Sequence, residues 1–167
     1  MELRTDGRRL EGHAAVFGVP APIGDFKETI RAGAFRSSLA TPGRDVLALV
    51  DHDPGRLLAR TSSGTLRLAE DGRGLAFSID VPDTQLGHDV LALARRGDLG
   101  GCSFGFRVME EAWPAADRRE LLAVELVEIS IVHAHPAYSQ TTVHARSRAM
   151  TDAFAAVTAR RRFLAAL

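Results

Sequence analysis

The sequence has one cysteine and no excess of either charge, and each shortage excludes a class of protein. A single cysteine in 167 residues excludes an internal disulfide framework and argues against thiolate metal sites, so a reducing compartment is adequate. Lys and Arg together number 21, as do Asp and Glu, so no net charge attracts nucleic acid or an anionic membrane. We therefore expect no nucleic-acid partner, no metal and no cofactor.

Long hydrophobic runs are also missing. The N-terminal residues MELRTDGRRLEGH carry charges where a signal peptide needs an apolar region, and no run approaches the roughly 20 apolar residues of a membrane span. Hydrophobic residues make up 46% and charged residues 25%, the balance of a soluble globular protein. We expect a cytoplasmic protein without membrane contact, with one domain over residues 1–148 and a helical tail over residues 149–167.

Strand patterns outnumber helix patterns along the chain. Apolar runs or period-two alternation, typical of strands, occur over residues 13–18, 46–50, 65–69, 75–81, 102–108 and 121–132. Helices are predicted over residues 32–40 and from Asp83 or Thr84 to about Arg96, with Gly97 as the stop. Residues 111–119 are predicted to be a polar excursion between strands.

The order of these elements lacks the regular alternation of a parallel α/β fold. We expect an α+β protein, with a small and mostly antiparallel β-barrel ringed by a few helices. Apolar residues recur on one stripe from residue 150 onward, so residues 149–167 are predicted to form an amphipathic C-terminal helix.

A serine stands between glycines at the start of one apolar run, in the stretch LGGCSFGF over residues 99–106. In a strand, Cys102 and Phe104 would face one way, and Ser103 and Gly105 the other. Glycine inside a strand often marks close approach by a ligand, so a peptide could lie beside Ser103. Cys102 is interpreted as a core residue. From this stretch alone, Ser103 can equally be an ordinary strand serine next to a glycine turn.

A serine nucleophile needs an imidazole to take its proton and an acceptor to orient that imidazole. His52 ends a buried apolar run and is flanked by two aspartates, which makes it the candidate base. Glu128 places a carboxylate inside an apolar run, where an unpaired charge is costly, so it is the candidate orienting acid. The alternatives are a solvated strand end for His52 and a solvent-facing Glu128 that shares its face with Ser130.

Two other functions are considered for the same residues. The motif GCSFG around Ser103 matches the nucleophile elbow of α/β-hydrolases, with a downstream base at His133, His135 or His144. That elbow needs a strand before the serine and a helix after it, whereas the predicted context is the reverse. His133 and His135 would also share one strand face as metal ligands, but a third ligand with motif spacing is missing.

Seven short motifs occur in order along residues 11–143, and together they resemble a known family. They are Glu28-x-Ile30-x-x-Gly33-Ala34-Phe35, His52-Asp53, Gly55-Arg56, Gly74-Leu75, Ser103-Phe104-Gly105-Phe106, Leu126-x-Glu128-x-Ser130-x-Val132 and Pro136-Ala137-Tyr138. In this combination they resemble the prohead maturation proteases of tailed phages, distant relatives of the herpesvirus assemblins.

The resemblance implies a serine endopeptidase that acts inside the assembling prohead, in the host cytoplasm. Its substrates would be the scaffold or the N-terminal scaffold-like segment of the major capsid protein, and often the protease itself. The resemblance matches Ser103 to the nucleophile, His52 to the base and Glu128 to the third member, with His133 or His135 left open for that role. It allows a homo-oligomer. The alternative is a non-enzymatic assembly or scaffold factor with the same fold.

Overall fold

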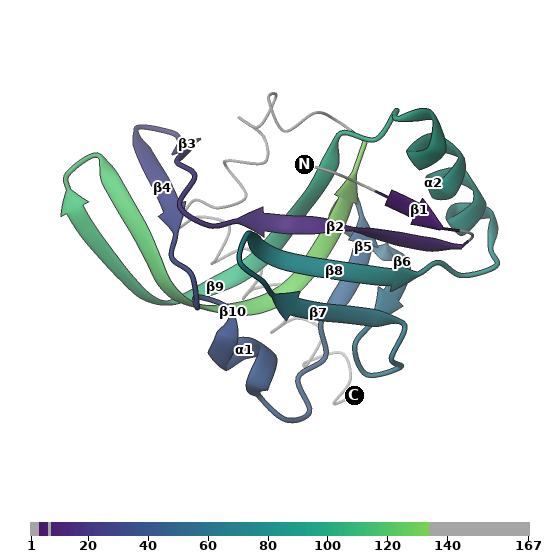
Figure 1. Ribbon diagram of the computed structural model, residues 1–167, viewed down its shortest axis with the longest axis horizontal. Helices are drawn as coiled ribbons and strands as arrows, with labels where there is room; N and C mark the ends of the chain where they lie inside the picture. Colours follow the sequence, from purple (N-terminus) through teal and green to yellow (C-terminus); the bar gives the residue numbers. More distant parts are fainter. Residues whose placement is uncertain (1–3, 7, 134–167) are drawn as a thin grey trace, which may run out of the picture.

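The computed structural model describes residues 4–6 and 8–133, and their strands form two sheets around a shared core (Figure 1). One sheet has the order β1-β2-β8-β7, and the other has the order β3-β4-β10-β5-β6 with β9 paired to β10. The strands are β1 (Arg4–Asp6), β2 (Arg9–Val16), β3 (Ala21–Ile23), β4 (Phe26–Ile30), β5 (Leu47–Val50), β6 (Asp53–Arg60), β7 (Leu66–Glu70), β8 (Gly74–Asp80), β9 (Gly101–Ala115) and β10 (Arg118–Val132). The described helices are α1 (Arg36–Ala40) and α2 (Gln85–Arg96).

The strands predicted over residues 65–69 and 75–81 are confirmed as β7 and β8, which pair in an antiparallel hairpin. Leu75, Phe77 and Ile79 of β8 are buried in the core, as the period-two pattern predicted. At its start, β8 passes very close to β2, because a Cβ placed on Gly74 would lie 1.9 Å from the carbonyl oxygen of Ala15. Glycine is therefore required there by the approach of two backbones.

The predicted helix before the serine strand is also confirmed as α2. Thr84 caps its N-terminus, where the side-chain oxygen accepts a hydrogen bond from Gly87 N at 3.2 Å. Gly97 ends it in the left-handed conformation, with φ 75°. The other predicted helix is shorter than residues 32–40, because α1 begins only at Arg36.

The predicted polar excursion over residues 111–119 is instead the far end of the long β9–β10 hairpin, which extends beside β3 and β4 (Figure 1). The guanidinium carbon of Arg119 lies 5.9 Å from the ring centres of both Phe26 and Trp113. Those two rings meet edge to face at 5.1 Å. Contacts across strands thus stabilise a segment whose local composition is polar.

The strands do not close into the expected barrel, and this expectation was wrong. β10 is long enough for β4 to pair with its first part and β5 with its last part, both in parallel, on the edge opposite β9. The other pairings are antiparallel, and the described strands stay in two sheets with open ends. The α+β class is confirmed. The predicted boundary at residue 148 and the helix over residues 149–167 lie outside the described residues.

None of the helices in the described part of the chain is both long and apolar enough to span a membrane.

Candidate active site

The turn after β5 carries His52 in an unusual backbone conformation. Asp51 and His52 have φ values of 51° and 58°, in the left-handed region that non-glycine residues rarely adopt. Asp51 N donates to Ile131 O at 3.0 Å, and His52 N donates to the hydroxyl of Ser130 at 2.7 Å. Because both partners belong to β10, the turn is held against the last residues of that strand.

The side chain of Asp51 also holds the turn, through contacts with His133 and Arg56. Its carboxylate accepts hydrogen bonds from His133 N at 3.0 Å and from Arg56 Nη1 at 2.8 Å, and lies 2.6 Å from His133 Nδ1. Partial burial raises the pKa of Asp51, but the hydrogen bonds with His133 outweigh it and lower the pKa below its ordinary value. The structure therefore brings His133 to Asp51 rather than to the ring of His52.

The imidazole of His52 is instead paired with Glu128. His52 Nδ1 lies 2.7 Å from Glu128 Oε1, and Glu128 is 1% exposed. The room for this carboxylate comes from Gly105, since a Cβ placed there would lie 2.6 Å from Glu128 Oε1. The sequence predicted space for a peptide beside Gly105. In the folded protein the Glu128 side chain fills that space.

Ser103 lies on the same face of the β9–β10 pair as Glu128. In the register of β9 with β10, Ser103 is opposite Ser130, and Gly105 is opposite Glu128. Side chains directly opposite in an antiparallel pair share a face, with Cβ atoms roughly 5 Å apart. We call the surface formed by Ser103, Gly105, Glu128 and Ser130 the Ser103 face. Ser103 thus stands across from the hydroxyl that holds the His52 backbone.

The second ring nitrogen of His52 does not face Glu128. Its Nε2 atom is buried, and no residue in the described ranges 4–6 and 8–133 hydrogen-bonds to it. With Nδ1 facing a buried carboxylate, Nε2 is the atom that a neutral imidazole would use to accept a proton. The arrangement can therefore support general-base chemistry beside a serine hydroxyl.

Cys102 points away from the Ser103 face and packs in the core. Burial raises the pKa of its thiol far above the ordinary value, and the nearby charge of Glu128 raises it further. A thiolate at this position is therefore strongly disfavoured. The structure agrees with the interpretation of Cys102 as a packing residue.

The esterase alternative lacks its structural context. A nucleophile elbow places the serine on a sharp turn between a strand and a helix. Ser103 lies inside β9, and the preceding element is the helix α2. Of the histidines suggested as a downstream base, His133 contacts Asp51, whereas His135 and His144 lie outside the described residues.

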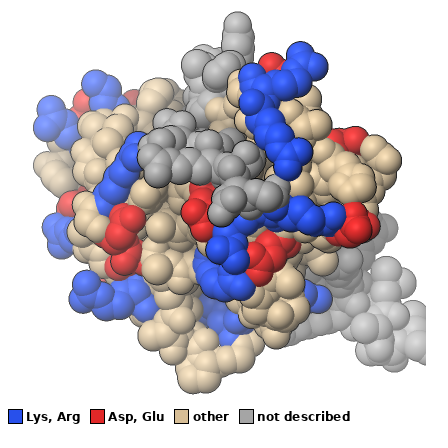
Figure 2. Space-filling model, turned by 45° about the vertical axis from the view of Figure 1, so that its right-hand side comes forward, with Lys and Arg blue, Asp and Glu red and all other residues tan. Residues whose placement is uncertain are grey.

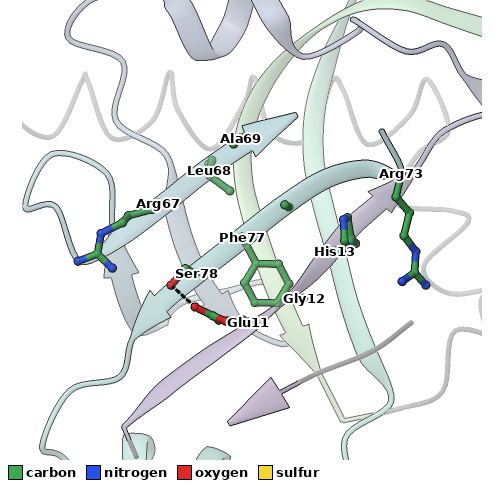
Figure 3. Close-up of a pocket in the computed structure, with 10 residues that line it drawn as sticks. Glu11, Gly12, His13, Arg67, Leu68, Ala69, Arg73, Phe77 and Ser78 are labelled. Atoms are coloured by element: carbon green, nitrogen blue, oxygen red, sulfur yellow. Dashed lines mark hydrogen bonds between the residues drawn. The ribbon is translucent and has the colours of Figure 1, made fainter. Parts of the chain in front are cut away.

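Other histidine–carboxylate pairs in the described residues are much more exposed. The carboxylate side chains in the pairs of His13, His88 and His133 are 47%, 77% and 38% exposed, against 2% for Glu128. His13 borders a cavity of about 510 Å³ on the sheet of β2, β7 and β8 (Figure 3). There Ser78 donates to Glu11 at 3.1 Å, so its hydroxyl already has a carboxylate partner. This cavity is separate from the Ser103 face.

Within residues 4–6 and 8–133 no cluster of three metal-ligating side chains occurs. His135, which the sequence paired with His133 as a possible metal ligand, lies outside the described residues.

Sequence reasoning did not assign functions to Ser130 and Asp51. Ser130 follows Glu128 by two residues, so strand alternation already places the two side chains on one face. The contacts of Asp51 had no such signal, because they depend on how the end of β10 meets the turn after β5.

In serine proteases a buried carboxylate orients the imidazole of the base, and the contact of Glu128 with His52 has this form. The chain matches the family model described as caudovirus prohead serine protease over residues 1–154, and it belongs to that family. It is a serine protease of phage capsid maturation, as the resemblance implied. No curated protein matches the chain.

Proposed function

We propose that the protein is an endopeptidase in which Ser103 is the nucleophile, His52 the general base and Glu128 the acid that orients it. The observation that carries the proposal is the 2.7 Å contact between His52 Nδ1 and the buried Glu128, with Ser103 opposite Ser130 on the same face. An unpaired buried carboxylate is costly, and in the resting protein the imidazole gives Oε1 of Glu128 a hydrogen-bond partner.

The proposed reaction proceeds by acyl transfer. The Ser103 hydroxyl oxygen attacks the scissile carbonyl carbon while His52 Nε2 takes the hydroxyl proton, and the imidazolium donates through Nδ1–H to Glu128. The tetrahedral intermediate collapses when His52 returns that proton to the leaving amine, which breaks the peptide bond. Water, deprotonated by His52, then attacks the ester, and Ser103 regains its proton.

The family implies capsid proteins as substrates and the assembling capsid in the host cytoplasm as the place of action. More specifically, we propose that the protein removes scaffold or the N-terminal scaffold-like segment of the major capsid protein, and cleaves itself. Association into a homo-oligomer is part of the same proposal. Neither Cys102, which is buried in the core, nor a metal takes part in the proposed reaction.

Ser103→Ala tests the nucleophile. The capsid protein is co-expressed with the wild type, with Ser103→Ala or with the control Ser78→Ala, and its mass is measured. Ser78 lies on β8 in the other sheet. Its variant therefore makes the same serine-to-alanine change in a strand, but away from the candidate site. We expect truncated capsid protein with the wild type and with Ser78→Ala only. Equal processing by Ser103→Ala would exclude Ser103 as the nucleophile and favour a different mechanism or a non-enzymatic role.

A further inference from the structure

A cavity of about 390 Å³ lies where the loop over residues 41–45 meets the middle of β9 and β10. Two arginines line it, Arg44 from the loop and Arg107 from β9. Both donate to the same oxygen of Glu125, Arg44 at 2.7 Å and Arg107 at 2.9 Å. Two guanidinium groups therefore share one carboxylate.

The charges around this cavity do not balance. Asp45, which also lines the cavity, is already paired with Arg60. Three guanidinium groups thus face two carboxylates, so the cluster has one positive charge in excess. The Nε atom of Arg44 is buried and finds no hydrogen-bond partner in the described part of the chain. Each arginine bonds Glu125 through its Nη1 atom, and the Arg107 side chain is 38% exposed, so its other N–H groups can bind another anion.

This imbalance differs from the surface shown in Figure 2, where basic and acidic side chains lie beside one another. Arg31 with Glu120 and Arg96 with Asp98, for example, are pairs of one cation and one anion, each at 2.8 Å. Such exposed pairs are neutral and contribute little.

The cavity continues the Ser103 face along β9. Ser103, Gly105 and Arg107 alternate onto one side of this strand, and Arg107 lies opposite Glu125 just as Gly105 lies opposite Glu128. Arg107 lies four positions after Ser103 in the strand, a distance of about 13 Å at roughly 3.3 Å per residue. An extended peptide advances by the same amount, so it would cover this distance in about four residues.

We propose that Arg107 and Arg44 form a substrate subsite that takes an acidic side chain, Asp or Glu, about three to five residues from the scissile bond. The inference rests on the proposed function, because it measures the distance from Ser103 as the nucleophile. The carboxylate of the substrate would accept hydrogen bonds from the guanidinium groups, with Glu125 keeping both arginines in place.

The test is a cleavage profile of the full-length protein on a library of synthetic peptides, read by mass spectrometry. We expect the wild type to favour Asp or Glu at one position three to five residues from the cleaved bond. The ratio of kcat/KM for an acidic peptide over its amide counterpart should fall about fivefold to tenfold in Arg107→Gln and in Arg44→Gln. Arg107→Glu should shift the preference at that position to Lys or Arg, which a merely structural role of Arg107 would not produce.

Arg67→Gln is the matched control, because Arg67 pairs with Asp80 on the other sheet and should leave the ratio unchanged. Circular dichroism of each variant checks folding, and Arg44→Gln stands in if an Arg107 variant fails to fold. Cleavage by the wild type without an acidic preference in that window, or an unaltered preference in Arg107→Glu, would overturn the subsite alone. Absence of any cleavage of peptides and capsid protein by the wild type would overturn the proposed function and the subsite with it.

Discussion

Replacing Gly105 by Ala adds a single carbon atom, and we expect that atom to displace the carboxylate of Glu128. The added Cβ would lie 2.6 Å from Glu128 Oε1, and Oε1 is also the atom that lies 2.7 Å from His52 Nδ1. The Cγ and Cδ atoms of Glu128 would be 3.1 and 3.2 Å away, so rotating the carboxylate alone does not relieve the contact. The whole carboxyl group must retreat.

The size of the effect follows from these distances. Ordinary contact with a Cβ begins at 3.4 Å, so Oε1 must move by about 0.8 Å from its present 2.6 Å. If His52 stays fixed by Ser130, the hydrogen bond lengthens from 2.7 Å toward about 3.5 Å, beyond useful geometry. A hydrogen bond to a charged group contributes about 1.5–3 kcal/mol. Its loss in the transition state would lower kcat/KM by about tenfold to 150-fold.

The assay compares kcat/KM on one capsid-derived peptide for the wild type, Gly105→Ala and the control Gly72→Ala. A Cβ on Gly72 meets no atom within 4 Å, so this control adds the same methyl group in open space. We expect Gly72→Ala to match the wild type and Gly105→Ala to remain folded by circular dichroism.

A double-mutant cycle then identifies the cause. If Gly105→Ala acts by displacing the carboxylate, adding it to Glu128→Gln should cost much less than adding it to the wild type. Full activity of Gly105→Ala would refute the reasoning, because it would show that the contact between Glu128 and His52 does not support cleavage.

Three further predictions concern stability and reactivity. Because burial raises the pKa of Cys102, the folded protein should resist alkylation at pH 7 and take one label per chain after unfolding in guanidinium; rapid labelling of the folded form would contradict this. Gly74→Ala should lower the free energy of unfolding in urea by about 3 kcal/mol or more, since its Cβ would meet the backbone oxygen of Ala15 at 1.9 Å, and an unchanged midpoint would show that β2 and β8 separate easily. Partial burial raises the pKa of Asp51, but the hydrogen bonds with His133 outweigh burial and lower this pKa in the folded protein. The ionised carboxylate therefore stabilises the fold fully above the unfolded pKa near 3.8, and this stabilisation is lost as the pH falls through the folded pKa. Asp51→Asn should therefore be less stable than the wild type at pH 7, with a difference that shrinks below about pH 4; a difference that persists in acid would assign the effect to packing.

Local features of the fold could be predicted because neighbouring residues encode them. The alternation of β8 depends on residues two apart, and the ends of α2 depend on the capping side chain of Thr84 and the left-handed Gly97. The polar tip of the β9–β10 hairpin could not be predicted in this way. It is stabilised by Arg119 packing on Phe26, a residue of another strand.

The candidate site shows the same division. The sequence by itself determined the residue types, a serine beside a glycine, a histidine after a buried strand and a carboxylate in an apolar run, together with the motifs of the family. Only the tertiary structure decided that Glu128, and not His133, contacts His52. Glu128 contacts His52 across 76 positions of sequence, and His133 contacts Asp51 across 82 positions. No local sequence pattern contains either contact.

A bulge in β10 explains why Glu128 reaches His52. Leu126 pairs with Phe106 and Glu128 with Gly105, so Val127 is an extra residue between them. Strict alternation would place Leu126 and Glu128 on one face. The bulge instead leaves Leu126 in the core and puts Glu128 on the Ser103 face, next to His52. The sequence determines which side chain stands at each position. Strand pairing between distant segments determines which face of the sheet that side chain occupies.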